Sequence, residues 1–259
     1  MLNQLIKRGE KVPKDIIEGH FAKKGLSFNE GNALIIGLFN EIVQKAKSYK
    51  VLKENKIASS RDSIARSLFE SYVYLQFVLK SNNKRDLAHS YLASVRNDEF
   101  ALYRLITEDN RVGRKIRDWL NIDESSIKKD SGIDEDYFDQ ELFSNVYQMR
   151  KPNHKWYNLD GKTNNLEALC HRLEMDEYYN LIYRIFSKEV HSKNVMKLYQ
   201  IEQEHLVGLG ITVDEKLHDS IISFYLLNSI RDVYKEYGMK KELREFNAIV
   251  SINYRYKRK

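Results

Sequence analysis

The sequence predicts an all-α fold, a single helical-bundle domain, from three observations. The chain of 259 residues contains only two prolines and eleven glycines, so the breakers that separate the strands of β-sandwiches and α/β sheets are scarce. Hydrophobic residues make up 42% of the chain and charged residues 31%, which is typical of a globular protein with a real core. Long segments repeat apolar residues at every third or fourth position, the period of an amphipathic helix.

The first two long helices are expected over 29–52 and 59–81. The earlier segment carries an apolar stripe with lysines on the opposite side, and the later one is the most hydrophobic long segment of the chain. We therefore place 59–81 at the centre of the bundle. Ser59 or Ser60 is the expected N-cap, and Asp62 lies in the first turn, where its charge favours the helix dipole.

The rest of the chain continues as helices separated by polar segments. Residues 121–136 are rich in Asp, Glu, Ser and Lys and read as a loop, whereas 151–165 contains Trp156 and reads as a structured loop. Gly238 is well placed to end a helix. Helices are expected over 84–107, 112–122, 165–174, 176–192, 214–238 and 240–252.

The domain organisation follows from the absence of breaks in this pattern. Sustained heptads, internal repeats and low-complexity blocks do not occur. We expect an N-terminal helical arm over 1–27 and one all-α domain over 28–259, ending in the short basic tail 253–259.

Common cofactor and metal motifs are missing from the sequence. It contains no phosphate-binding glycine pattern and no HExxH, and its seven histidines are scattered without metal-ligand spacing. Cys170, the single cysteine, lies on the apolar side of a predicted helix, where a buried thiol is expected. Its neighbour His171 points about 100° away on a helix, which argues against a nucleophile pair. We expect neither a cofactor nor a metal.

The charge and hydropathy of the chain bear on its partners. The first residues contain no apolar segment of signal-peptide length, and the longest apolar runs are too short to cross a bilayer. We therefore expect a cytoplasmic protein without membrane contact. The net charge is +6, and the tail 253–259 mixes basic and aromatic residues. Such a tail either contacts RNA, through phosphates and stacked bases, or is simply solvated.

One candidate site residue pair lies in the central helix. Arg66 and Glu70 are four residues apart, a spacing that on an exposed helix gives only a weak ion pair. Here the pair shares its side of the helix with Val73 and Phe77. Charges among apolar neighbours must be paired or functional, because burying either one alone costs several kcal/mol.

A second polar group lies in 183–193, where Tyr183, Ser187 and His191 follow one another at four-residue steps. On a helix these side chains share one face, and Arg184, seven residues before the histidine, projects about 20° from it. An imidazole beside a guanidinium is suited to attack on a phosphodiester, with His191 moving a proton and Arg184 stabilising the charge. The alternative is a histidine that interacts with the helix dipole while Ser187 bonds to its own helix.

Three segments together, 65–79, 154–173 and 178–192, resemble the uncharacterised domain-of-unknown-function family 5677. The shared pattern is an early helix with Arg and Glu four apart, then a tryptophan-containing loop, then a helix with Tyr, Ser and His at four-residue steps. It matches here through Arg66, Glu70, Trp156, Tyr183, Ser187 and His191.

That family is similar in architecture to HEPN-type helical domains, many of which are metal-independent ribonucleases of toxin, antitoxin and anti-phage systems. The resemblance implies an Arg-to-His motif, which Arg184 and His191 fit at its longest spacing, and a site built between two subunits of a homodimer. The residue after the arginine is commonly polar in those enzymes and is Ile185 here. The Tyr, Ser and His pattern therefore fits this sequence better.

The sequence leaves open whether the protein is an enzyme. In a ribonuclease, His191 would act as acid or base, Arg66 or Arg184 would bind phosphate, and Glu70 would orient a cationic partner. Lys155 would hold the RNA backbone and Trp156 would stack a base. The alternative is a non-catalytic interaction or ligand-binding module, in which Arg66, Glu70, Tyr183, Ser187 and His191 form a buried structural network or line a pocket.

Overall fold

A computed structural model of the chain describes residues 1–57, 60–122, 155–183, 186, 199–202, 205–209 and 215–255. The chain divides into two compact units. The first unit combines 1–84 with 166–259, and the second spans 85–165. The described residues are overwhelmingly helical, which confirms the all-α prediction.

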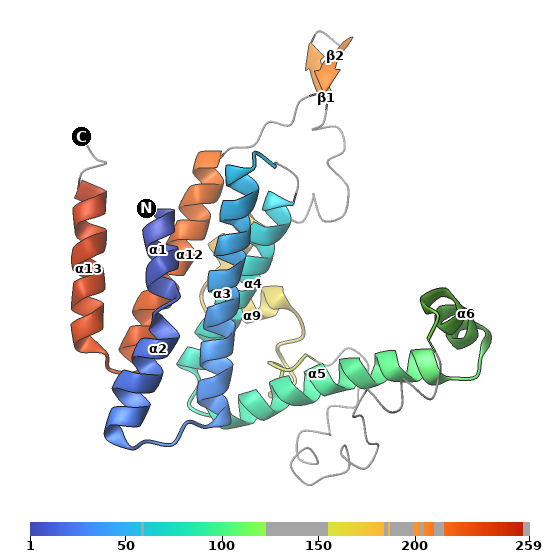
Figure 1. Ribbon diagram of the computed structural model, residues 1–259, viewed down its shortest axis with the longest axis horizontal. Helices are drawn as coiled ribbons and strands as arrows, with labels where there is room; N and C mark the ends of the chain where they lie inside the picture. The colour runs from blue at the N-terminus through green and yellow to red at the C-terminus, as the bar shows by residue number, and fades with distance from the viewer. Residues whose placement is uncertain are drawn as a thin grey trace. The chain divides into compact units, whose positions relative to one another are not determined.

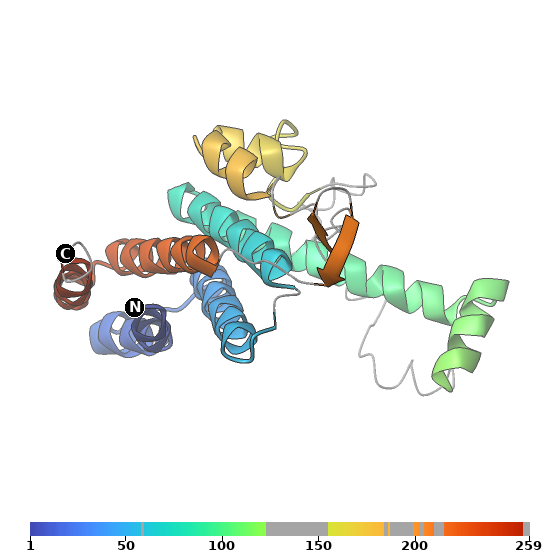
Figure 2. The ribbon, with the colours of Figure 1, turned by 90° about the horizontal axis from the view of Figure 1, so that it is seen from above.

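Three long helices form the centre of the first unit. They are α3 (Glu30–Glu54), α4 (Arg61–Lys80) and α12 (Glu215–Glu236). Each contacts the other two, and both ribbon views place them side by side (Figure 1, Figure 2). The expected central position of the 59–81 segment is therefore confirmed.

The central helices form because each carries a wide apolar stripe. Their largest fully buried hydrophobic side chains include Phe39 on α3, Phe69 on α4 and Tyr225 on α12. The Asn29 side chain caps α3 by accepting a hydrogen bond from the backbone N–H of Asn32 at 3.0 Å. Burial of this stripe supplies most of the stability of such helices.

The N-terminal segment packs on this centre as two helices and a π-helix. They are α1 (Leu2–Gly9), α2 (Val12–Ile16) and η1 (Ile17–Ala22). The α1 helix contacts both α3 and α12, and a Cβ at Gly9 would lie 3.0 Å from Val43, so glycine permits the close approach to α3. Tyr234 of α12 fixes the segment further, since its hydroxyl donates to Asp15 at 2.7 Å.

The helix α12 ends just before Gly238, as the sequence predicts. Gly238 has a φ of +62° directly after α12. The backbone N–H of Met239 bonds to the carbonyl of Tyr234, and that of Gly238 to the carbonyl of Lys235, which is the Schellman arrangement. The last helix, α13 (Lys240–Arg255), then packs on α12.

Shorter elements lie between α4 and α12 in the chain. They are α9 (Leu166–Arg172), α10 (Asp176–Tyr178) and the π-helix η4 (Tyr179–Tyr183). Both α9 and η4 contact α4. Downstream of them, β1 (Tyr199–Glu202) and β2 (His205–Leu209) pair antiparallel with an irregularity between Gln200 and Ile201.

The second unit contains α5 (Lys84–Thr107), which begins at the unit boundary, α6 (Arg111–Leu120) and the segment 155–165. This segment is a structured loop, as expected. The Asn158 side chain accepts from the backbone of Thr163 at 2.7 Å and donates to Asn164 at 2.8 Å. Tyr157 is buried beside it.

Three local features differ from the sequence-based expectations. The β1–β2 ladder was not expected, although Tyr199 to Glu202 alternates apolar and polar residues as a strand does. Residues 179–183 form a π-helix in place of the expected α-helix. Ser60 occupies the N-cap position of α4 in a left-handed conformation and makes no capping hydrogen bond with its side chain. The domain boundaries expected at residue 28 stay a prediction.

Candidate functional site

A polar stripe runs along α4 at four-residue steps. It consists of Asp62, Arg66 and Glu70, which share one side of the helix because four residues are close to one turn. Each of the first two bonds to a residue from another part of the first unit. The stripe therefore connects the central helix with two other elements.

Arg66 is the centre of this stripe. Its Nε donates to Oε1 of Glu70 at 3.1 Å, and its Nη2 donates to the hydroxyl of Tyr183 at 2.6 Å. The Arg66 side chain is 17% exposed and the Glu70 side chain 29%, so solvent screens this pair less than an open surface pair. Nη1 is buried, and within the described residues it has no hydrogen-bond partner.

Tyr183 holds the guanidinium in two ways. The hydroxyl accepts the hydrogen bond, and the ring lies under the cation with Arg66 Cζ 4.4 Å from the ring centroid. The ring also stacks on Tyr179, with centroids 4.9 Å apart and planes at 16°. The π-helical turn places residues 179 and 183 in this register, so it positions the group that orients Arg66.

His218 of α12 pairs with the first residue of the stripe. Its Nε2 lies 2.7 Å from Oδ1 of Asp62, and the residue is 4% exposed. The ring stacks at 6.2 Å on Tyr49 of α3 and lies 5.0 Å from the ring of Phe186. This pair joins three helices in the interior of the unit.

Sequence reasoning missed His218 and assigned Asp62 only a role at the helix dipole. A lone histidine in "EKLHDSII" carries no motif. Extending the four-residue step back from Arg66 and Glu70 would have found Asp62, but its partner 156 residues away is visible only in three dimensions.

The residues predicted for the site on the helices 59–81 and 176–192 divide into two groups. Arg66, Glu70 and Tyr183 come together, as expected from the sequence. Arg184, Ser187 and His191 lie outside the described residues. Their roles, and their place beside Arg66, stay predictions.

Lys155 and Trp156 belong to the second unit. The side chain of Lys155 is exposed, whereas Trp156 is only 8% exposed. The indole packs edge-on against Tyr91 and Tyr157, with centroids 5.2 and 5.6 Å away. The backbone carbonyl of Trp156 accepts a hydrogen bond from the hydroxyl of Ser90 at 2.6 Å. In this arrangement the ring serves the packing of the loop.

Cys170 is fully buried in α9, as expected. Burial, assisted by the negative charges of Asp176 and Glu167, raises the pKa of its thiol to about 12. A thiol with this pKa stays protonated at neutral pH and is a poor nucleophile. The geometry gives no support to a role in catalysis.

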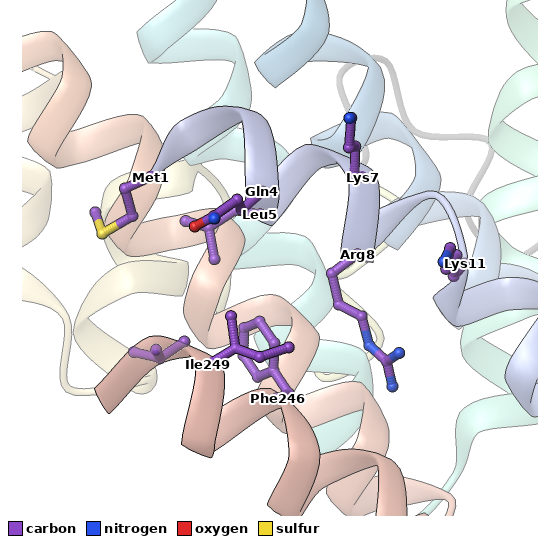
Figure 3. A pocket seen from close by; sticks show the side chains of 9 residues that line it. Met1, Gln4, Leu5, Lys7, Arg8, Lys11, Phe246 and Ile249 are labelled. Atoms are coloured by element: carbon purple, nitrogen blue, oxygen red, sulfur yellow. The ribbon is translucent and has the colours of Figure 1, made fainter. Parts of the chain in front are cut away.

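A separate groove lies between α1 and α13, outside the stripe. It has a volume of about 390 Å³, and Leu5 and Arg8 extend from α1 toward Phe246 and Ile249 on α13 (Figure 3). Arg8 lies 3.4 Å from the carboxylate of Asp15. None of the predicted site residues that the structure describes lines this groove.

Metal ligation and membrane insertion find no support in the part of the chain that the structure describes. Among these residues, no three His, Cys, Asp or Glu side chains gather closely enough to hold a metal ion. Every helix in the same part is too short or too polar to cross a membrane.

Comparison with known proteins assigns the chain to a family whose function is unknown. No curated protein matches it, and no solved structure does either. The model of a family of unknown function matches residues 32–205, more than half of the chain, and this range contains the α4 stripe and Tyr183. The chain therefore belongs to the family of unknown function DUF5677.

Proposed function

We propose that the protein is a metal-independent ribonuclease in which Arg66 binds a phosphate of the RNA and His191 transfers a proton. The observation that carries the proposal is the state of the Arg66 guanidinium. Glu70 and Tyr183 hold it from two sides, and Nη1 has no acceptor among the described residues. A phosphate oxygen is an acceptor to which the guanidinium geometry is well matched.

The proposed chemistry needs no metal. The 2′-hydroxyl of one nucleotide loses its proton to His191 and its oxygen attacks the adjacent phosphorus. A bond from this oxygen to phosphorus forms while the bond from phosphorus to the 5′-oxygen breaks, and the leaving oxygen takes a proton from water or the imidazolium. Arg66, with Arg184, stabilises the charge that develops on the phosphoryl oxygens.

Several parts of this proposal come from the HEPN resemblance. They are the Arg-to-His pairing, the homodimer with two sites facing each other, and a role in toxin or anti-phage systems. The exposed Lys155 is assigned to the RNA backbone in the same proposal, and the protein is assigned to the cytoplasm.

A second candidate function is favoured by the burial of the same group. Arg66 is mostly shielded from solvent, and its hydrogen bonds join α4 to η4. In a non-catalytic interaction module, the cluster would specify helix packing, and binding would take place on other surfaces.

One experiment separates the two. The purified protein and its His191→Ala variant are incubated with total cellular RNA in a metal chelator, and thermal unfolding of both is recorded. The ribonuclease proposal expects cleavage by the parent alone at similar stability. His171→Ala is the matched control, because this histidine is exposed and distant in sequence from the stripe. Absence of cleavage by the folded parent, with His191→Ala melting well below it, would favour the packing network.

A further inference from the structure

One of the two tryptophans of the chain is almost fully exposed. Trp119, near the end of α6, is 84% exposed, in contrast to the buried Trp156. It borders a shallow hollow of about 530 Å³, and the described residues that line it all come from α6: Arg111, Val112, Lys115, Ile116 and Trp119. Val112, which is 53% exposed, lines the same hollow, so the two side chains form a small apolar patch that suits a ligand with a flat apolar surface.

The lining residues form one continuous helix face. Positions 111, 115 and 119 follow at four-residue steps, with 112 and 116 directly beside them, so cations and apolar groups alternate along the helix. Lys115 and Arg111 precede the indole by about 6 and 12 Å along the helix axis. This face therefore presents a flat aromatic ring on the same side of the helix as two positive charges, with position 119 turned by about 40° from 115 and about 80° from 111.

The rest of α6 is fixed by contacts within its own unit. Asn110 caps the helix by accepting from the backbone of Val112 and Gly113, each at 2.9 Å. Arg117 donates to the carbonyl of Ile106, and Arg114 pairs with Asp109 at 3.0 Å. These contacts hold the exposed face in place without using it.

A close approach of backbones adds to this anchoring. A Cβ at Gly113 would collide with the carbonyl oxygen of Glu108, so glycine is needed where α6 turns back on the end of α5. The helix is therefore a fixed platform on its unit.

Arg111 and Lys115 differ from Arg114 and Arg117 of the same helix in their partners. Arg114 and Arg117 are engaged at the start of the helix and the end of α5. In the part of the chain that the structure describes, the ion pair formed by α6 involves Arg114, and neither Arg111 nor Lys115 takes part in it. Among the described residues, neither charge is neutralised by a partner carboxylate, and both therefore suit an anionic ligand.

We infer that α6 is a docking platform for single-stranded RNA, with a base stacked on Trp119 and phosphates bound by Arg111 and Lys115. Aromatic rings interleaved with cations are the usual means of binding single strands without reading their sequence. The identification of the nucleic acid as RNA rests on the proposed function. The platform takes over the stacking role that the sequence assigned to Trp156.

Two other occupants suit an apolar, basic helix face less well. A membrane surface would need a larger apolar face than Val112, Ile116 and Trp119 provide on a helix of ten residues. A second copy of the chain would bring Arg111 and Lys115 of both copies toward one another if the faces met about a twofold axis, and like charges repel.

The test uses the full-length chain with His191→Ala as background, so that RNA is not consumed. Binding of a fluorescently labelled uridine oligonucleotide is measured by anisotropy over a range of salt concentrations. Trp119→Ala is expected to weaken binding about 5- to 150-fold, and Trp119→Phe to retain most of it. Arg111→Gln and Lys115→Gln should each weaken binding and reduce the salt dependence by about one counterion.

Matched controls come from the same unit. Leu102→Ala removes another exposed apolar side chain, and Lys162→Gln another exposed cation. Both should bind as the parent does, and circular dichroism should show unchanged helix content in every variant. Equal binding by parent and Trp119→Ala, or no binding by either, overturns the platform.

Further arms identify the wrong occupant directly. A blue shift of tryptophan emission on adding phosphatidylglycerol vesicles, lost in Trp119→Ala, would assign the face to membranes and overturn the inference. Conversion of a dimer into a monomer by Trp119→Ala in sedimentation would assign it to a second copy, with the same consequence.

The platform and the ribonuclease can fail separately. Oligonucleotide binding that depends on Trp119, in a parent protein that cleaves nothing, would support the platform and refute the enzyme. Cleavage that is equally efficient in Trp119→Ala at low RNA concentration would support the enzyme and refute the platform.

Discussion

The guanidinium of Arg66 donates a hydrogen bond of 2.6 Å to the hydroxyl of Tyr183, 117 residues further along the chain. This contact joins the central helix α4 to the π-helical turn η4. Because η4 directly precedes, in the chain, the segment that contains Ser187 and His191, the contact fixes the last described turn before that segment.

Removal of the Tyr183 hydroxyl tests the strength of this contact. Tyr183→Phe keeps the ring under the cation and loses the acceptor, so we expect the free energy of unfolding to fall by about 1 to 2 kcal/mol. Urea unfolding measures it. In an Arg66→Met background the same substitution should cost close to nothing, and an undiminished cost there would show that the hydroxyl acts through another partner.

The buried His218–Asp62 pair is expected to be structural. His218→Ala leaves the Asp62 carboxylate without its partner in the interior and should lower the free energy of unfolding by about 1 to 3 kcal/mol. His171→Ala is the matched control, since His171 pairs with Asp176 at 3.0 Å on the surface and should cost less than about 1 kcal/mol. Loss of RNA cleavage by folded His218→Ala protein, with stability unchanged, would instead give His218 a role in the chemistry.

Stability should decline in alkaline solution. The pKa of Cys170 is raised from 9.0 to about 12, and burial raises the pKa of Tyr72 and Tyr237 above their ordinary 10.0. At a pH between the unfolded-state pKa and the folded-state pKa of each group, the unfolded chain has lost a proton that the folded chain still holds. The stability that these groups contribute is therefore fully present below about pH 9 and falls as the pH rises.

Urea unfolding at about pH 8 and about pH 10.5 measures this loss, and Cys170→Ala should show a smaller loss than the parent. The same burial predicts that iodoacetamide modifies Cys170 only after unfolding. Rapid modification of the native protein at neutral pH would contradict the burial of this thiol.

Two glycine substitutions should change stability in opposite directions. Gly238 adopts a φ of +62° at the end of α12, so Gly238→Ala should cost about 1 to 2 kcal/mol. Gly37 lies within α3, and a Cβ added to it would meet no atom within 4 Å, so Gly37→Ala should stabilise by about 0.5 to 1 kcal/mol. Thermal unfolding midpoints report both, and a shift of the same sign for the two would contradict the helix boundaries.

Local sequence patterns were sufficient for most helices. Apolar stripes located α3, α4, α5 and α12, and the glycine stop after α12 followed from the preference of glycine for a left-handed backbone. The pairing of Arg66 with Glu70 followed from spacing along one helix. Patterns of this kind depend on residues near one another in the chain.

Contacts between distant segments were harder to predict. The bond from His218 to Asp62 and the burial of Trp156 depend on packing, and residue type alone favoured neither. The π-helical turn at Tyr179–Tyr183 differs from an α-helix by about one residue per turn, which apolar spacing over so short a segment does not resolve. The exposure of Trp119 likewise required the fold of α6.

The most direct test of the proposed chemistry is the product of RNA cleavage in the absence of metal. An oligoribonucleotide and the deoxyribonucleotide of the same sequence are incubated with the protein in a chelator, with His191→Ala in parallel. We expect the parent to cleave only the RNA and to leave a 2′,3′-cyclic phosphate, because the 2′-hydroxyl is the nucleophile. Intact RNA after incubation with correctly folded parent protein, or cleavage of both strands alike, would contradict the proposed ribonuclease.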